Sequence, residues 1–156
     1  MTTTRFLFRT LVVAVAMFAV GFVGHQLLLG SDYVSIEPIM RSKEDMQAHM
    51  PFALISCLCF SGALVWMYSQ GRNSKPWLGQ GMRFGVAVWA IASLPLYLTN
   101  YVIEPWPGAF VAKILGWELV AMSFLGILTA SLAKSDPIAG ARSRTDSFKV
   151  PPTDHC

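Results

Sequence analysis

The chain has 156 residues, of which 54% are hydrophobic and only 13% are charged. A soluble domain of this length carries roughly 25% charged residues, so about half of the charge expected on a water-exposed surface is missing. This composition excludes a soluble enzyme, a DNA-binding module and a disulfide-stapled secreted domain. The formal net charge of +3 is interpreted as a signal of membrane topology and not of nucleic-acid binding.

The apolar residues form four runs, each long enough for a helix that crosses a hydrocarbon core of about 30 Å. We predict spans at residues 10–30, 52–68, 84–103 and 109–133. Together they predict an all-α, polytopic membrane protein whose four-helix transmembrane domain, residues 10–133, is an up-down bundle. Residues 134–156 mix Ser, Asp, Arg and Pro with few large apolar groups, which predicts a flexible tail.

The first run begins after a basic segment, residues 1–9, as a secretory signal would. Gly24, His25 and Gln26, however, stand where the small-residue cleavage site of such a signal is expected. We therefore interpret the run as an uncleaved anchor helix.

Two local signals modify this helical plan. Ser42 followed by Asp45 is typical of a helix start, so residues 43–50 are expected to form about two turns between the first and second spans. Pro95 lies near the middle of the third span. Its ring removes a backbone donor, which predicts that the third helix is kinked there.

Lys and Arg are unevenly distributed between the two sides of the predicted spans. Of the 12 such residues, nine lie on the side that holds both termini, and Arg41, Lys43 and Lys113 lie on the other side. Positively charged loops are retained in the cytoplasm, so both termini are predicted to be cytoplasmic. The expected location is a cell membrane, most simply a bacterial inner membrane.

Glu118 lies near the middle of the fourth span, where an acidic side chain costs about 2.5 to 3.5 kcal/mol on insertion scales. Such a group should face the bundle interior and have a partner. His25, Gln26, Tyr97 and Asn100 come from the same outer half of the membrane, so we predict that they form an intramembrane polar cluster with Glu118. Two interpretations stay open: a hydrogen-bond network that fixes helix register, or a proton-relay, ligand or substrate site.

Thiols and histidines do not predict a redox or metal centre. Cys57 and Cys59 would lie about 200° apart around a helix, so we predict that both are buried packing residues and not a disulfide pair. The histidines are His25, His49 and His155, and only the first lies inside a predicted span. No metal, haem or other cofactor is therefore predicted, and no catalytic signature is recognised.

Small residues recur four positions apart on several predicted spans, as at Ala112 and Gly116 or at Gly126 and Ala130. Such stripes let helix backbones approach closely. Their number predicts more contact surface than one bundle uses internally. Besides membrane lipids, the expected partners are other membrane subunits or further copies of the chain.

Residues 5–134 resemble small four-helix inner-membrane proteins of bacteria whose role is unassigned. The resemblance rests on the number of spans, an Arg-led N-terminus and the segment Gln80-Gly81-Met82-Arg83-Phe84-Gly85 at the start of the third span. It implies an integral membrane bundle and carries no site or activity.

Three classes of function fit these observations. The preferred one is a non-catalytic accessory or scaffold subunit of a larger membrane complex, because the loops are too short for an active site outside the membrane. The first alternative is a small transporter or channel in which Glu118 binds a cation or a proton. The second alternative is a membrane enzyme that acts on a lipid or a quinone from the outer-half polar cluster.

Overall fold

The computed structural model describes residues 2–72 and 76–134, and every element in these ranges is helical. The predicted tail lies outside the described residues, apart from Lys134. Four helices are long and apolar enough to cross a membrane: Thr3–Leu28, Met50–Gly71, Trp77–Ile103 and Gly108–Ala133. The described part of the chain is thus all-helical, and its four candidate spans are those of a multi-pass membrane protein, as the hydropathy predicts.

The elements in chain order are α1 (Thr3–Phe22), the π-helical turn η1 (Val23–Leu28), the 3-10 helix η2 (Asp32–Ile39), α2 (Lys43–Ala48), α3 (Met50–Gly71), α4 (Trp77–Val88), the π-helical turn η3 (Trp89–Ser93), α5 (Leu94–Ile103) and α6 (Gly108–Ala133). All four long helices begin before the predicted spans. Hydropathy marks the apolar centre of a helix, whereas backbone hydrogen bonds continue into polar flanks. Arg5 and Arg9 are thus helical residues of α1.

The third membrane helix changes its winding just before its proline. Residues Trp89–Ser93 form the π-helical turn η3, and Pro95 follows as the second residue of α5. Proline has no N–H to continue the α-helical hydrogen-bond ladder. A π-helical turn is one of the local adjustments that accommodate this loss inside a membrane helix.

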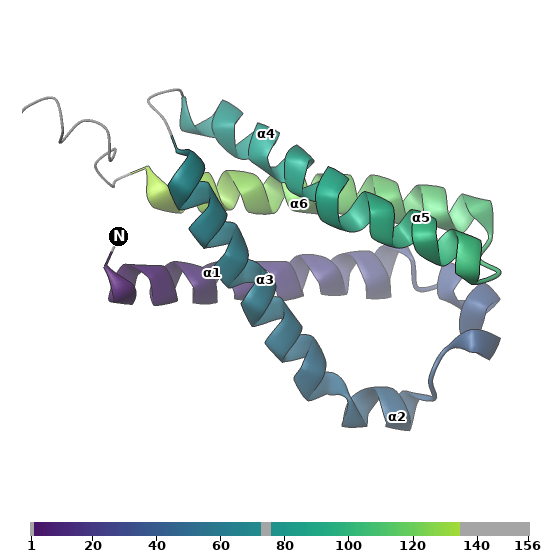
Figure 1. The fold of residues 1–156 in the computed structure, drawn as a ribbon. Helices are drawn as coiled ribbons and strands as arrows, with labels where there is room; N and C mark the ends of the chain where they lie inside the picture. Colours follow the sequence, from purple (N-terminus) through teal and green to yellow (C-terminus); the bar gives the residue numbers. More distant parts are fainter. Residues whose placement is uncertain (1, 73–75, 135–156) are drawn as a thin grey trace, which may run out of the picture.

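The helices pack as two pairs that meet along α1 and α6 (Figure 1). α4 lies along α6, and α3 crosses α1 obliquely and leaves the other helices towards α2. The buried residues of α3 are accordingly confined to its second half: Ser61, Leu64, Val65 and Tyr68. The central core draws on α1, α3, α4 and α6 and contains Val13, Leu64, Val65, Val88, Met122 and Leu125.

Glycines determine how closely α4 approaches α6. A Cβ atom built on Gly126 would lie 2.4 Å from the carbonyl oxygen of Gly81, and one built on Gly85 would lie 2.2 Å from that of Met122. No side chain fits at either distance. The two backbones are therefore in direct contact, which is the packing that small residues allow in membrane helices.

The segment between the first two spans folds onto the start of α6. The side chain of Ser42 accepts a hydrogen bond from the Asp45 N–H at 3.2 Å, which confirms the predicted start of α2. Nζ of Lys113 in α6 lies 2.7 Å from Oδ1 of Asp32 in η2. Beneath this ion pair, Leu29 and Ile36 pack with Phe110 and Ile114.

The two span cysteines differ from each other in environment. Cys57 is half-buried, and its Sγ donates to the carbonyl oxygen of Ala14 at 3.4 Å. Cys59 is exposed. The prediction that both are buried was wrong for Cys59, because a spacing of two residues that directs Cys57 towards α1 turns Cys59 away from it.

Candidate functional site

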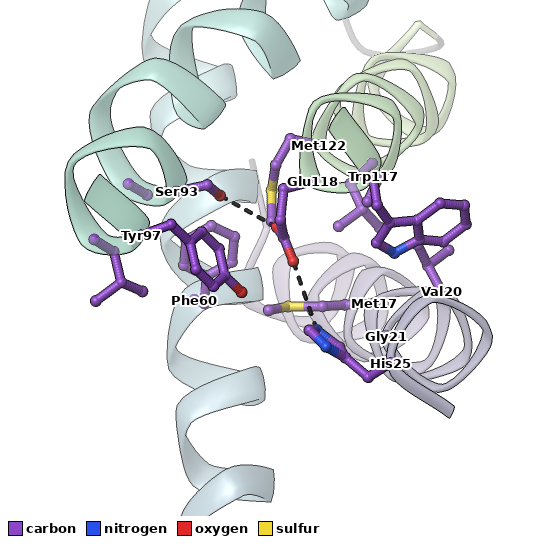
Figure 2. Close-up of a pocket in the computed structure, with 14 residues that line it drawn as sticks. Met17, Val20, Gly21, His25, Phe60, Ser93, Tyr97, Trp117, Glu118 and Met122 are labelled. Atoms are coloured by element: carbon purple, nitrogen blue, oxygen red, sulfur yellow. Dashed lines mark hydrogen bonds and ion pairs between the residues drawn. The ribbon is translucent and has the colours of Figure 1, made fainter. Parts of the chain in front are cut away.

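Glu118 faces inward from α6 at the centre of the bundle, with 9% of its surface exposed. The Ser93 hydroxyl donates a hydrogen bond to Oε2 of Glu118 at 3.2 Å. On the other side, Nε2 of His25 lies 3.7 Å from Oε1 (Figure 2). The carboxylate is thus held between the first and third membrane helices.

His25 connects this carboxylate to the segment between the first two spans. Its Nδ1 lies 2.6 Å from the Tyr33 hydroxyl oxygen in η2. When that hydroxyl donates to Nδ1, the ring proton lies on Nε2, the nitrogen that faces Glu118. Burial, followed by the nearby charge of Glu118, raises the pKa of Tyr33 to about 12, so the hydroxyl keeps its proton at neutral pH.

Two partners of Glu118, His25 and Ser93, lie on π-helical turns. His25 belongs to η1, and Ser93 is the last residue of η3. π-helical turns are rare and occur frequently at functional sites, because the extra residue in the turn changes the direction of the side chains. The indole N–H of Trp89 donates to the Leu115 carbonyl oxygen at 3.0 Å, which fixes η3 against α6.

A cavity of about 310 Å³ lies beside Glu118. Tyr97 directs its hydroxyl into it from α5, and Met17 and Phe60 face it from α1 and α3 (Figure 2). The full lining is Met17, Val20, Gly21, His25, Phe60, Ala92, Ser93, Leu96, Tyr97, Trp117, Glu118, Ala121, Met122 and Leu125. The site therefore combines a few polar groups with a largely apolar wall.

Trp117 closes the cavity beside α1 because a glycine makes room for it. A Cβ atom built on Gly24 would lie only 1.8 Å from Nε1 of the Trp117 indole. The ring thus lies directly on the backbone of η1, the turn that continues α1. Its N–H is buried and has no hydrogen-bond partner among the described residues.

The predicted polar cluster is brought together only in part. His25, Tyr97 and Glu118 line the same cavity, whereas Gln26 is exposed and Asn100 is half-buried away from it. Consecutive residues of a helical turn point in clearly different directions, so a turn that directs His25 inward directs Gln26 outward. Asn100 lies nearly one turn beyond Tyr97.

Sequence reasoning missed Ser93 and Tyr33. Ser93 precedes Tyr97 by four residues and so shares its helix face, which is a signal that was available in the sequence. Tyr33 lies in a 3-10 segment whose position on η1 depends on tertiary contacts, and no pattern in the sequence reports it.

Within residues 2–72 and 76–134, no group of three or more His, Cys, Asp or Glu side chains is placed to hold a metal ion. No protein-family model, curated protein or solved structure matches the chain. The fold and the site define a multi-pass helical membrane protein with a buried carboxylate and imidazole beside a small cavity.

Proposed function

We propose that the protein is a small membrane transporter or channel in which Glu118 takes up and releases a proton or a cation. The observation that carries the proposal is the environment of this carboxylate. It is buried in a span, and its basic neighbour within the described chain is a histidine 3.7 Å away. A carboxylate in low dielectric is stable only when it is neutralised by a proton or by a positive charge.

The groups around Glu118 support a route for the exchanged proton. His25 faces the carboxylate from η1, Ser93 from η3 and Tyr97 from α5. Tyr33 continues the series from His25 to the segment between the first two spans. A histidine can accept a proton at one ring nitrogen and release one from the other, and a tyrosine hydroxyl can accept and donate at its oxygen, so this series can relay a proton between the carboxylate and that segment.

The proposal also includes how the four helices and the two termini are arranged relative to the membrane. We place the four helices as an up-down bundle in a bacterial inner membrane, with both termini cytoplasmic and the third helix bent at Pro95. The excess of Lys and Arg on the side of the termini supports this orientation. The relay from Tyr33 would then begin at the outer face.

Proton flux into liposomes tests the function. Purified protein is reconstituted with a pH-sensitive dye trapped inside, and the rate of internal acidification is recorded after an external pH step. We expect Glu118→Gln to reduce the rate to that of protein-free liposomes, because the amide cannot carry the proton. Glu104→Gln is the matched control, since Glu104 follows α5 and does not line the cavity.

Size-exclusion chromatography of both variants verifies that they insert and fold. An unchanged rate for Glu118→Gln, or a wild-type rate no higher than that of empty liposomes, would contradict the proposal.

A second candidate is the accessory or scaffold subunit favoured by the loop lengths. One observation supports it: the first half of α3 buries no residue in the bundle, and its side chains Phe52, Leu54, Ile55 and Leu58 are exposed. This face is available to a helix of another subunit, as it is to lipid. The enzyme alternative, acting on a lipid or quinone, has no comparable support and stays a prediction.

A further inference from the structure

The volume of the cavity beside Glu118 suits a compact molecule better than a single ion. It measures about 310 Å³. Small-molecule sites occupy about 300 to 1,000 Å³, whereas one water fills about 30 Å³. Met17, Phe60 and Met122 supply apolar wall, and the carboxylate of Glu118 projects among them (Figure 2).

The charge of the cavity selects against anions. In the described chain, no Lys or Arg lines it. Glu118 accepts a hydrogen bond from Ser93, and its 3.7 Å separation from Nε2 of His25 is longer than a hydrogen bond and is an ion pair only when the imidazole is protonated. His25 is already paired through Nδ1 with Tyr33. While Glu118 is ionised and His25 is neutral, a bound cation would supply the counter-charge, whereas a neutral molecule would leave the carboxylate uncompensated.

The wall also distinguishes between kinds of cation. Hard inorganic cations need about six oxygen ligands, and the side-chain oxygens of this cavity come from Ser93, Tyr97 and Glu118 alone. Phe60, Tyr97 and Trp117 instead offer aromatic rings, which attract weakly hydrated organic cations through their π faces.

We propose that the cavity binds a small organic ammonium ion that carries one compact apolar group. Its nitrogen lies against Glu118, and its apolar group packs among Met17, Phe60 and Met122. This inference rests on the proposed function, because it names the class of cation that Glu118 exchanges. Binding can nevertheless be measured without transport, so the two proposals fail separately.

Calorimetric titration of the purified full-length protein in detergent with benzyltrimethylammonium tests the inference. Neopentylbenzene is the uncharged isostere, and benzylsulfonate is the anionic counterpart. We expect saturable binding of one ammonium ion per chain and no saturable binding of the other two. Glu118→Gln should weaken binding by about tenfold or more, because the counter-charge is lost. Glu104→Gln, outside the cavity, should leave the affinity unchanged.

Ala92→Leu provides an independent variant if Glu118→Gln fails to fold. Ala92 lines the cavity, so the larger side chain fills it without altering any charge. We expect this variant to lose binding as well. Full affinity in either variant, equal binding of the cation and its isostere, or binding of a short-chain quinone in place of the cation would overturn the inference.

The combined outcomes separate the two proposals. Ammonium binding without Glu118-dependent flux of either protons or the ammonium ion would keep the binding site and discard the transporter. Flux without ammonium binding would discard the ammonium site and keep the transporter.

Discussion

At the scale of single residues, Glu118 is positioned by groups from different elements. Ser93 approaches it from η3 and His25 from η1, while Tyr33 in turn holds His25. Interhelical contacts of this kind contribute modestly to stability in membranes. Their larger effect is on the orientation of the Glu118 side chain, because they keep its carboxylate at the edge of the cavity.

The pKa of Tyr33 provides a test of this arrangement. Burial and the charge of Glu118 both disfavour tyrosinate, which raises the pKa of Tyr33 from 10.0 to about 12. Because the raised pKa favours the neutral form in the folded state, its contribution to stability is complete below pH 10 and is lost as the pH rises through about 12.

We therefore expect the tyrosinate absorbance of the wild type minus that of Tyr33→Phe to titrate near pH 12. A difference curve centred near pH 10 would show that Tyr33 is not buried against His25 and Glu118.

At the scale of elements, the contact between α4 and α6 sets the position of the third helix. Gly81, Gly85 and Gly126 bring the two backbones together. This contact lies in α4, the helix that directly precedes η3. The hydrogen bond from Trp89 to α6 holds η3 itself in place. Ser93 reaches Glu118 only because both features keep the third helix close to α6.

Two glycines of α6 form a matched pair for testing that contact. A Cβ atom on Gly126 would lie 2.4 Å from the carbonyl oxygen of Gly81, whereas one on Gly116 would have nothing within 4 Å. We expect Gly126→Ala to destabilise the bundle by about 1 to 3 kcal/mol, because backbone must move to admit the methyl group.

Gly116→Ala should instead leave stability unchanged or raise it slightly, since alanine favours the helix. Reversible unfolding in mixed micelles measures both variants. Equal stability of the two would mean that α4 and α6 are not in backbone contact.

At the scale of the whole molecule, the bundle exposes most of its apolar side chains. Within an apolar 18-residue window of each span, the buried share of the residues ranges from 11% in the third helix to 33% in the fourth. In a membrane helix such exposure is expected, because lipid tails are as apolar as the side chains. The surface therefore does not by itself distinguish lipid contact from subunit contact.

Gentle detergent extraction from native membranes makes that distinction. The transporter proposal predicts elution alone or as a small oligomer of identical chains, since Glu118 and its cavity lie within one chain. Size and subunit composition are recorded on the same sample. Elution with other subunits in a fixed ratio would instead support the scaffold candidate and place the function in that complex.

The sequence by itself determined the number of spans, their approximate positions and the buried acidic residue. The free energy of transferring a segment from water into the bilayer is approximately a sum over its residues, so it can be read from the sequence. The backbone hydrogen bonds of a helix join residues only a few positions apart, so they too depend on local sequence. The start of α2 was predictable for the same reason, because Ser42 caps a helix that begins next to it. The helix ends were less predictable, since hydropathy does not report where a helix continues into polar flanks.

Only the tertiary structure decided which polar residues share the site. Whether His25 and not Gln26 faces Glu118 depends on the rotation of η1, and the place of Tyr33 depends on how η2 lies on α6. These positions result from contacts between residues far apart in the sequence, such as Gly24 with Trp117 and Asp32 with Lys113. Local periodicity fixes the order of side chains around each helix, but the packing of neighbouring helices fixes which side faces inward.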